Sequence, residues 1–258
     1  MSSTNWQNIN YTLNDNIKAA AGLKFDLSKI LTSEQHEIFK KYQEGANVTE
    51  EGSFFGFLTM IGHFCGNSFF LHYNSDSEEK CINLYSIIIG RSGSGKSNTI
   101  RVIKEAIMKV EKMFPNVYFK PVRIAEQEQE ASSVISDLSL LGLRKHLASQ
   151  NKILIHDEAD NVLHGYGVFD SGNAKYSAEA ALIIKAFDGI RDETRSTGSM
   201  SVTITRAKMS MLVATVGAKY NKLLKCWATV NGGLEGLHNR MIYQVLPSVE
   251  PTRPQEQV

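Results

Sequence analysis

The sequence predicts an α/β fold in which a mostly parallel central sheet is flanked by helices. Three consecutive observations support this prediction. Residues 82–89 form an apolar, β-branched run of strand length, residues 90–97 are rich in glycine and serine, and residues 98–114 follow a helical pattern. A strand that enters a glycine-rich loop and continues as a helix is the context of a phosphate-binding loop.

The loop Gly90-Arg91-Ser92-Gly93-Ser94-Gly95-Lys96-Ser97 fits the P-loop pattern G-x-x-x-x-G-K-[ST] at every fixed position. Glycines let successive backbone N–H groups point inward at an anion, and the following helix adds its positive end. Lys96 is expected to reach the β- and γ-phosphates, and Ser97 to bind Mg²⁺. We therefore expect a P-loop nucleoside triphosphatase fold with ATP and Mg²⁺ as cofactors. The predicted nucleotide-binding residues are Gly90, Arg91, Ser92, Gly93, Ser94, Gly95, Lys96, Ser97 and Asn98.

An acidic pair follows a second buried strand. Residues 153–155 are aliphatic, so Asp157 is expected at the carboxyl end of a strand that neighbours the one feeding the loop. Asp157 is the candidate second ligand of Mg²⁺. Glu158 is the candidate group that orients or deprotonates water, which favours hydrolysis over transfer to a substrate hydroxyl. The alternative interpretation is a solvated acidic turn at the end of a strand.

Two other features of this segment are given less weight. Residues 157–160 spell Asp-Glu-Ala-Asp, the box of a large helicase group, but the other motifs of that group are not visible in the chain. His156 precedes the acidic pair, and a single histidine in a strand is more often a packing residue than a catalytic one.

Composition limits the choice of partners and compartment. The chain has 258 residues and a formal net charge of +1, so nucleic-acid binding would require a local basic patch. Cys65, Cys81 and Cys226 are too widely spaced for a metal site or a disulfide framework, which suits a reduced cytoplasmic or nuclear interior. The polar segment 1–15 lacks the apolar core of a secretion signal, so the protein is not expected to be secreted.

The most apolar stretch, 53–71, is interrupted by glycines and contains no apolar run long enough to span a bilayer. It is expected to form a core helix, 54–65, and a strand, 68–73, so no membrane association is predicted. The expected organisation is a partly helical N-terminal extension (1–50), an ATPase domain (51–247) and a flexible tail (248–258). Other expected elements are helices at 32–42, 130–149, 178–187 and 220–227, strands at 117–124, 201–205, 209–216 and 238–246, a solvated turn at 74–80, and loops at 163–176 and 191–199.

Two further side chains are candidates for roles in hydrolysis. Thr215 ends an apolar strand and fits the polar residue that ATP-hydrolysing motors usually carry at the tip of the strand beside the acidic one. Arg240 is the leading candidate for an arginine finger supplied in trans by a neighbouring subunit, with Arg191 and Arg195 as rivals. Each of these residues also has an ordinary structural interpretation, as a strand threonine or a surface arginine.

The order of several short motifs extends the argument across residues 50 to 247. The motifs are Phe69-Phe70-Leu71, Asn83-Leu84-Tyr85, the glycine loop, Leu154-Ile155-His156-Asp157-Glu158, Phe187-Asp188-Gly189, Leu212-Val213-Ala214-Thr215 and Gly236-Leu237-His238-Asn239-Arg240.

In this order the chain resembles an uncharacterised P-loop ATPase family of phages, plasmids and other mobile elements, often fused to primase-type modules. That family is similar to ring-forming replicative helicases and other RecA-like or AAA+-like ATPases. The resemblance implies ATP-driven work on single-stranded or double-stranded nucleic acid by a homo-oligomeric ring. The family usually continues well past the arginine motif, whereas this chain stops soon after it, so we expect a fragment or a reduced module.

The leading functional hypothesis is therefore a Mg²⁺-dependent ATPase module of a mobile-element replication protein. Alternatives are a nucleotide-dependent switch or oligomerisation scaffold with little turnover and, less favoured, a small-molecule kinase. A basic patch for nucleic acid competes with an ordinary mixed-charge surface. Its candidate members are Arg191, Arg195, Arg206, Lys208, Lys219, Lys222 and Lys225, interleaved with Tyr220 and Trp227.

Overall fold

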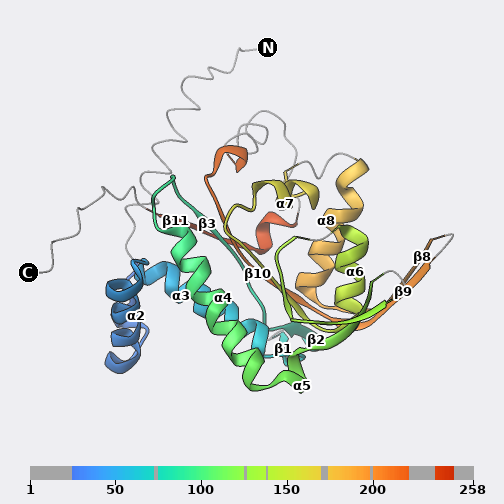
Figure 1. The fold of residues 1–258 in the computed structure, drawn as a ribbon, viewed down its shortest axis with the longest axis horizontal. Helices are drawn as coiled ribbons and strands as arrows, with labels where there is room; N and C mark the ends of the chain where they lie inside the picture. The colour runs from blue at the N-terminus through green and yellow to red at the C-terminus, as the bar shows by residue number, and fades with distance from the viewer. Residues whose placement is uncertain are drawn as a thin grey trace, which may run out of the picture.

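The structure is a computed structural model that describes residues 25–72, 75–124, 127–137, 139–169, 174–197, 200–220 and 236–246. Most of the predicted helix 220–227, with Lys222, Lys225, Cys226 and Trp227, lies outside these ranges, as do the start of the chain and the tail 248–258. Within them, the predicted α/β class is confirmed, since helices flank a five-stranded sheet in which every paired strand is parallel (Figure 1).

The strands of the central sheet do not follow one another in chain order. The spatial order is β11 (Met241–Val245), β3 (Tyr85–Ile89), β10 (Met209–Thr215), β7 (Lys152–His156) and β6 (Val134–Ile135). Parallel strands need crossover connections, which helices provide here. Because all five strands point the same way, their carboxyl ends meet at one edge of the sheet.

Strand β10 separates the glycine-loop strand from the acidic strand. Its Thr215 is in register with Ile89 of β3, and its Val213 is in register with His156 of β7. The expectation that the acidic strand directly neighbours the loop strand is therefore wrong. All seven residues of β10 are buried, and this burial on both faces favours a central place in the sheet.

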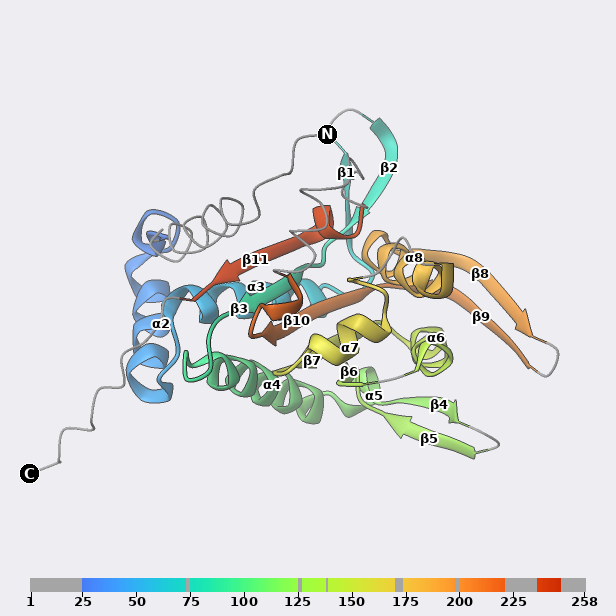
Figure 2. The ribbon, with the colours of Figure 1, turned by 90° about the horizontal axis from the view of Figure 1, so that it is seen from above.

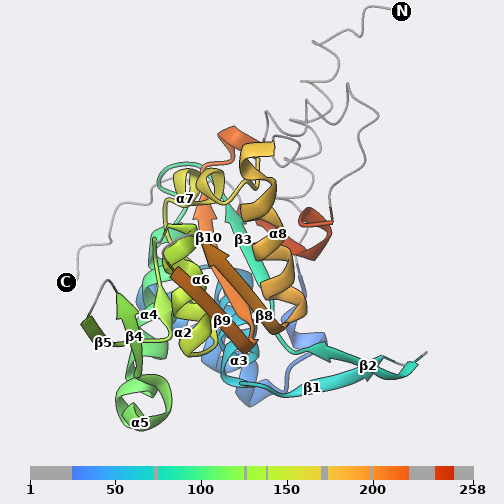
Figure 3. The ribbon, with the colours of Figure 1, turned by 90° about the vertical axis from the view of Figure 1, so that its right-hand side faces the viewer.

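Helices cover both faces of the sheet (Figures 1 and 3). On one side, α3 (Glu50–Phe64) and α4 (Lys96–Met113) contact the strands. On the other side lie α6 (Leu140–Ser149), α7 (Asp160–Gly165) and α8 (Ala174–Asp188). The arrangement has three layers, helix–sheet–helix, which is the usual way to bury both faces of a parallel sheet.

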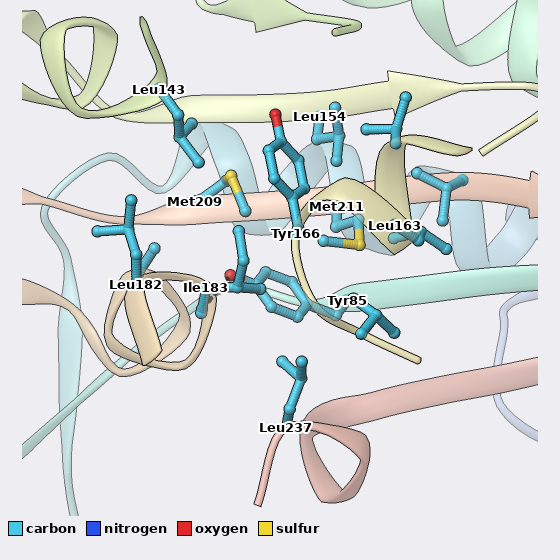
Figure 4. Packing of buried hydrophobic residues seen from close by; sticks show 14 of the residues in the cluster. Tyr85, Leu143, Leu154, Leu163, Tyr166, Leu182, Ile183, Met209, Met211 and Leu237 are labelled. Atoms are coloured by element: carbon cyan, nitrogen blue, oxygen red, sulfur yellow. Dashed lines mark hydrogen bonds between the residues drawn. The ribbon is translucent and has the colours of Figure 1, made fainter. Parts of the chain in front are cut away.

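The two-residue period of the strands divides the core into two clusters. In β3, Ile87 belongs to the cluster under α6, α7 and α8, while Ile88 belongs to the cluster under α4. Figure 4 shows the larger cluster, where Tyr85 and Met211 of the sheet lie among side chains of the covering helices. The Tyr85 hydroxyl donates a hydrogen bond of 2.7 Å to the carbonyl of Ile183 in α8. That bond satisfies the polar tip of a fully buried ring.

The N-terminal region packs against the sheet domain. A 3₁₀ turn, η1 (Leu27–Lys29), precedes α2 (Ser33–Ala46), which begins at the expected position because Thr32 forms a capping box with Gln35. Leu27 and Phe39 contact Phe54 of α3 in a third small cluster.

Three antiparallel hairpins extend from this core and contradict several predictions. They are β1 (Phe69–His72) with β2 (Ser75–Cys81), β4 (Lys120–Ile124) with β5 (Gln127–Ala131), and β8 (Ile190–Thr197) with β9 (Met200–Ala207) (Figure 2). Residues 75–80 of the predicted turn, the first part of the predicted helix 130–149 and residues 191–197 of the predicted loop are in strands. Their polar sequences carry weak local strand signals, and hydrogen bonding to a partner strand decides their conformation.

Two smaller predictions also change. The expected strand 117–124 begins with a short helix, α5 (Pro115–Tyr118), and only its second part is β4, where Pro121 lies in a two-stranded sheet. The expected loop 163–176 is helical at both ends, in α7 and α8. In the described residues, no helix combines the length and apolar character needed to cross a membrane.

A buried polar network ties α3 and α4 to the segment before β6. Glu111 near the end of α4 is 1% exposed and accepts hydrogen bonds from the Ser133 backbone N–H at 2.8 Å and from the Ser133 hydroxyl. The Ser133 hydroxyl has one proton, so it accepts at the same time from Nε2 of His63 in α3, at 2.7 Å. The network holds α4 from its carboxyl end, while its amino end carries the glycine loop.

Burial keeps the His63 imidazole neutral. Desolvation, reinforced by the positive charges of Lys208 and Lys152, lowers the pKa of His63 from its ordinary 6.5 to about 3. The unfolded chain therefore binds a proton below pH 6.5 that the folded chain does not bind until about pH 3. Stability supplied by this difference is present above pH 6.5 and is lost as the pH falls toward 3.

We expect His63→Gln to weaken this acid sensitivity. Between pH 7 and pH 4.5, the unsubstituted chain should lose about 2.5 kcal/mol more unfolding free energy than the variant, from the linkage relation. Urea unfolding followed by circular dichroism at both pH values measures the difference. Equal losses in the two proteins would show that His63 is protonated in the folded state.

Candidate functional site

One open pocket lies at the carboxyl edge of the sheet, where β3, β10 and β7 end. Its volume is about 530 Å³, within the range of small-molecule sites. Residues from the glycine loop, the acidic segment and the end of β10 share its walls. The lining residues are Asn47, Ser92, Gly93, Ser94, Gly95, Lys96, Ser97, Asn98, Asp157, Glu158, Asp160, Asn161, Thr215 and Val216.

The glycine loop has the local geometry that its sequence predicts. Gly93 and Gly95 have φ values of 81° and 80°, in the left-handed region that favours glycine. Helix α4 begins directly after Gly95, at Lys96, so its unpaired N–H groups face the pocket end of the helix. The backbone N–H of Gly90 donates to the carbonyl of Thr215 at 3.1 Å, which ties the start of the loop to β10.

Lys96 is held by its own loop. The residue is 8% exposed, and its Nζ donates to the carbonyls of Gly90 at 2.6 Å and Arg91 at 2.7 Å. An ammonium group has three N–H donors, so a third is left for a ligand. Burial lowers the pKa of Lys96, while the negative charges of Glu158 and Asp160 act in the opposite direction. The ammonium therefore lies under the influence of carboxylates across the pocket.

The acidic pair follows β7 as predicted and stands at the pocket wall. Asp157 and Glu158 are both exposed, with 54% of the Asp157 side chain accessible. His156 is not simply a packing residue, since its Nδ1 accepts a hydrogen bond from the backbone N–H of Glu158 at 3.0 Å. This bond fixes the turn that presents both carboxylates to the pocket.

Thr215 lies where the sequence predicts it, at the carboxyl end of the strand beside the acidic one. It is 1% exposed, and its hydroxyl donates to Oδ2 of Asp160 at 2.7 Å and accepts from the N–H of Gly217 at 3.0 Å. Sequence reasoning missed Asp160 as a site residue. The only signal was the fourth letter of the Asp-Glu-Ala-Asp box at 157–160.

A residue before the predicted ATPase domain also reaches the pocket. Asn47 ends α2 in the left-handed conformation (φ 50°) and lines the pocket beside the loop. Its carbonyl accepts a long hydrogen bond of 3.4 Å from Nδ2 of Asn98. The same oxygen lies 3.3 Å from where a side chain on Gly95 would begin. No motif marked Asn47, because its place depends on how α2 packs.

The candidate arginine fingers are not among the pocket-lining residues. Arg240 directly precedes β11, at the amino edge of the sheet, and its guanidinium contacts both carboxylate oxygens of Asp188 at 3.1 and 2.6 Å. Arg191 pairs with Glu79, and Arg195 is exposed on the β8–β9 hairpin. A role for any of them in trans stays a prediction.

The predicted basic patch is not one surface. Lys208 is buried and donates to the carbonyls of Gly62 and Ile82, and Lys219 donates to the carbonyl of Asp160 at the opposite edge of the sheet. Of the candidate cations that the structure describes, three share the β8–β9 hairpin, and they are Arg191, Arg195 and Arg206. Tyr220 is buried in the core.

The pocket chemistry fits a magnesium-bound nucleotide. Ser94 is 3% exposed and lines the pocket, and its buried hydroxyl has no hydrogen-bond partner among the described residues. Within the described ranges, no three His, Cys, Asp or Glu residues converge as a metal site. Mg²⁺ commonly takes only one or two protein ligands, with phosphates and water completing its shell. Ser97 and Asp157 are the residues that would hold it.

No family model, curated protein or solved structure matches the chain. The resemblance to mobile-element ATPases therefore stays a prediction, and the functional argument depends on the pocket itself.

The contact between Gly95 and Asn47 gives a test of the loop geometry. We expect Gly95→Ala to lower the unfolding free energy by roughly 1–2 kcal/mol, because a left-handed alanine is strained, and to weaken ATP binding. Gly45→Ala in α2 is the matched control. Open space surrounds Gly45, so alanine there should be neutral or stabilising. Urea unfolding and titration with a fluorescent ATP analogue measure both effects, and full binding by Gly95→Ala would contradict this view of the loop.

Proposed function

We propose that the protein is a Mg²⁺-dependent ATPase. One observation carries the proposal: three adjacent parallel strands lead into the glycine loop, Thr215 and the Asp157–Glu158 pair, and all three line a single pocket. A phosphate cradle, a buried polar side chain and carboxylates are the groups that phosphoryl transfer to water requires. ATP is the nucleotide proposed, and the pocket residues described do not by themselves select its base.

Each wall of the pocket has a distinct task in this proposal. The N–H groups of the glycine loop and the start of α4 bind phosphate oxygens, and the third N–H of Lys96 reaches the β- and γ-phosphates. Bound Mg²⁺ supplies positive charge that offsets the charge on those phosphates. Glu158, exposed at the pocket wall, accepts a proton from the attacking water. Transfer of the phosphoryl group to a second substrate, as in a small-molecule kinase, is less favoured because a carboxylate at the pocket wall can accept a proton from water.

ATP turnover is expected to depend on Lys96 and Glu158. Lys96→Ala should lower turnover and weaken ATP binding, since it removes the ammonium from the phosphate site. Glu158→Gln should lower turnover by about 10²- to 10⁴-fold while binding is retained, because it removes a proton acceptor. Phosphate release measured with saturating ATP and Mg²⁺ provides the readout.

Matched surface variants control for nonspecific effects. Lys109→Ala on the exposed side of α4 and Glu37→Gln on α2 change the same residue types away from the pocket. Both should turn over ATP like the unsubstituted chain. Turnover that survives Lys96→Ala and Glu158→Gln would overturn the ATPase proposal.

A second candidate function is a nucleotide-dependent switch or assembly scaffold with little turnover of its own. The observation in its favour is that, among the residues that the structure describes, no arginine lines the pocket, while Arg240 is paired with Asp188 in the same chain. An arginine supplied in trans typically accelerates hydrolysis by about 10³- to 10⁵-fold. A chain without that arginine in its own pocket would bind ATP and assemble before it hydrolyses efficiently.

Action on nucleic acid in a mobile-element replication protein is the finer proposal, supported only by the motif order and the family resemblance. The arginines of the β8–β9 hairpin are its best structural candidates. Single-stranded or double-stranded nucleic acid that stimulates ATP turnover, with an affinity that falls steeply with salt, would support this role.

Assembly is tested by mass. In the Glu158→Gln variant, where bound ATP should persist, ATP with Mg²⁺ is expected to raise the mass measured by light scattering to a multiple of the 28.7 kDa chain. Lys96→Ala should stay at its nucleotide-free mass because its phosphate site is impaired. An unchanged mass in Glu158→Gln with bound ATP would overturn both the ring and the scaffold.

A further inference from the structure

Asp160 lines the pocket and is held there by a hydrogen bond from Thr215. It is the first residue of α7, and its Oδ2 accepts the hydroxyl proton of Thr215 at 2.7 Å. Thr215 is itself fixed by its place in the centre of the sheet and by the N–H of Gly217 at 3.0 Å. The Asp160 carboxylate is thereby held in one orientation from the strand beneath it.

The other carboxylate oxygen is left without a partner. Oδ1 of Asp160 is buried and accepts no hydrogen bond from any described residue. A buried carboxylate oxygen without a donor is costly, since its hydration is lost and not replaced. Asp160 lines the pocket, and its Oδ1 is closed to solvent in this state, so a donor in the pocket reaches this oxygen once the groups that cover it move aside. The arrangement favours a bound molecule with an O–H or N–H group.

The charge of Asp160 acts on the phosphate site. Lys96, Glu158 and Asp160 line the same pocket, so the two carboxylates and the ammonium face one space. A γ-phosphate bound by Lys96 and an attacking water bound by the two carboxylates would meet in the space between these side chains.

We infer that Asp160, held by Thr215, binds and orients the water that attacks the γ-phosphate. The inference rests on the proposed ATPase function. One O–H of that water donates to Oδ1 of Asp160, and the other O–H faces Glu158. As the water oxygen bonds to the γ-phosphorus, the bond from that phosphorus to the β–γ bridging oxygen breaks. The bridging oxygen keeps the electron pair and leaves on ADP, and the water proton passes to Glu158.

This division of labour gives the two carboxylates separate roles. Glu158 is exposed and accepts the proton, whereas Asp160 is fixed by Thr215 and sets the direction of attack. Two acceptors define the position of a water better than one, because each hydrogen bond fixes one O–H direction. Thr215 then acts through Asp160 as a positioning residue.

The test compares nearly isosteric variants in single-turnover hydrolysis of γ-labelled ATP and in binding of a ribose-labelled fluorescent ATP. Asp160→Asn should lower the hydrolysis rate about 10²-fold or more, while the dissociation constant changes less than about threefold. Thr215→Val should have a comparable effect, and Thr215→Ser, which keeps the hydroxyl, should restore most of the rate. Asp137→Asn, an exposed acid outside the pocket, should be unaffected. Retained nucleotide binding shows that each variant is folded.

Three outcomes would overturn the inference. The first is hydrolysis by Asp160→Asn within twofold of the unsubstituted rate. The second is a tenfold rise in the Mg²⁺ concentration for half-maximal activity of Asp160→Asn, which would make Asp160 a metal ligand. The third is failure of Thr215→Ser to recover activity. Absence of turnover in the unsubstituted chain would overturn the ATPase proposal as well, so the two failures are distinguishable.

Discussion

The parallel pairing of β10 with β3 on one side and β7 on the other is the constraint on which the rest of the structure depends. This pairing aligns the ends of three strands, so that Thr215 stands between the glycine loop and the acidic turn. It also supplies the Thr215 carbonyl that anchors the N–H of Gly90. Ligand sites in open α/β sheets lie beyond the carboxyl ends of the strands, and here the alignment brings the glycine loop, Thr215 and the acidic turn to that edge.

At the opposite edge of the sheet, a buried polar network stabilises the fold and fixes the helix that begins at the glycine loop. Glu111, Ser133 and His63 form a buried network that attaches the far end of α4 to α3 and to the segment before β6. Helix α4 begins at Lys96, so its position determines where the loop and the ammonium lie. Buried polar groups of this kind impose a specific geometry when each has a partner. The glycine loop is therefore supported by interactions at both ends of one helix.

Parts of the chain outside the motif-bearing segments complete the pocket. Asn47 lies at the end of α2 against Gly95, so the N-terminal region contacts the glycine loop directly. Arg240, by contrast, is at the amino edge of the sheet and is occupied by Asp188. Arg240 is not among the residues that line the pocket of its own chain, so its proposed role in hydrolysis would require a second subunit.

The sequence by itself determined the strand–loop–helix unit, the acidic pair and the position of Thr215, because each depends on residue types at short, fixed spacing. One strand of each hairpin was predicted, within 68–73, 117–124 and 201–205, but its partner was missed, since polar strands such as 75–81 and 190–197 become strands only through hydrogen bonds to a partner. The place of β10, the contact of Asn47 with the loop and the bond between Asp160 and Thr215 were decided by tertiary structure alone. Each joins residues far apart in the chain, and no local pattern encodes which distant segments will pack together.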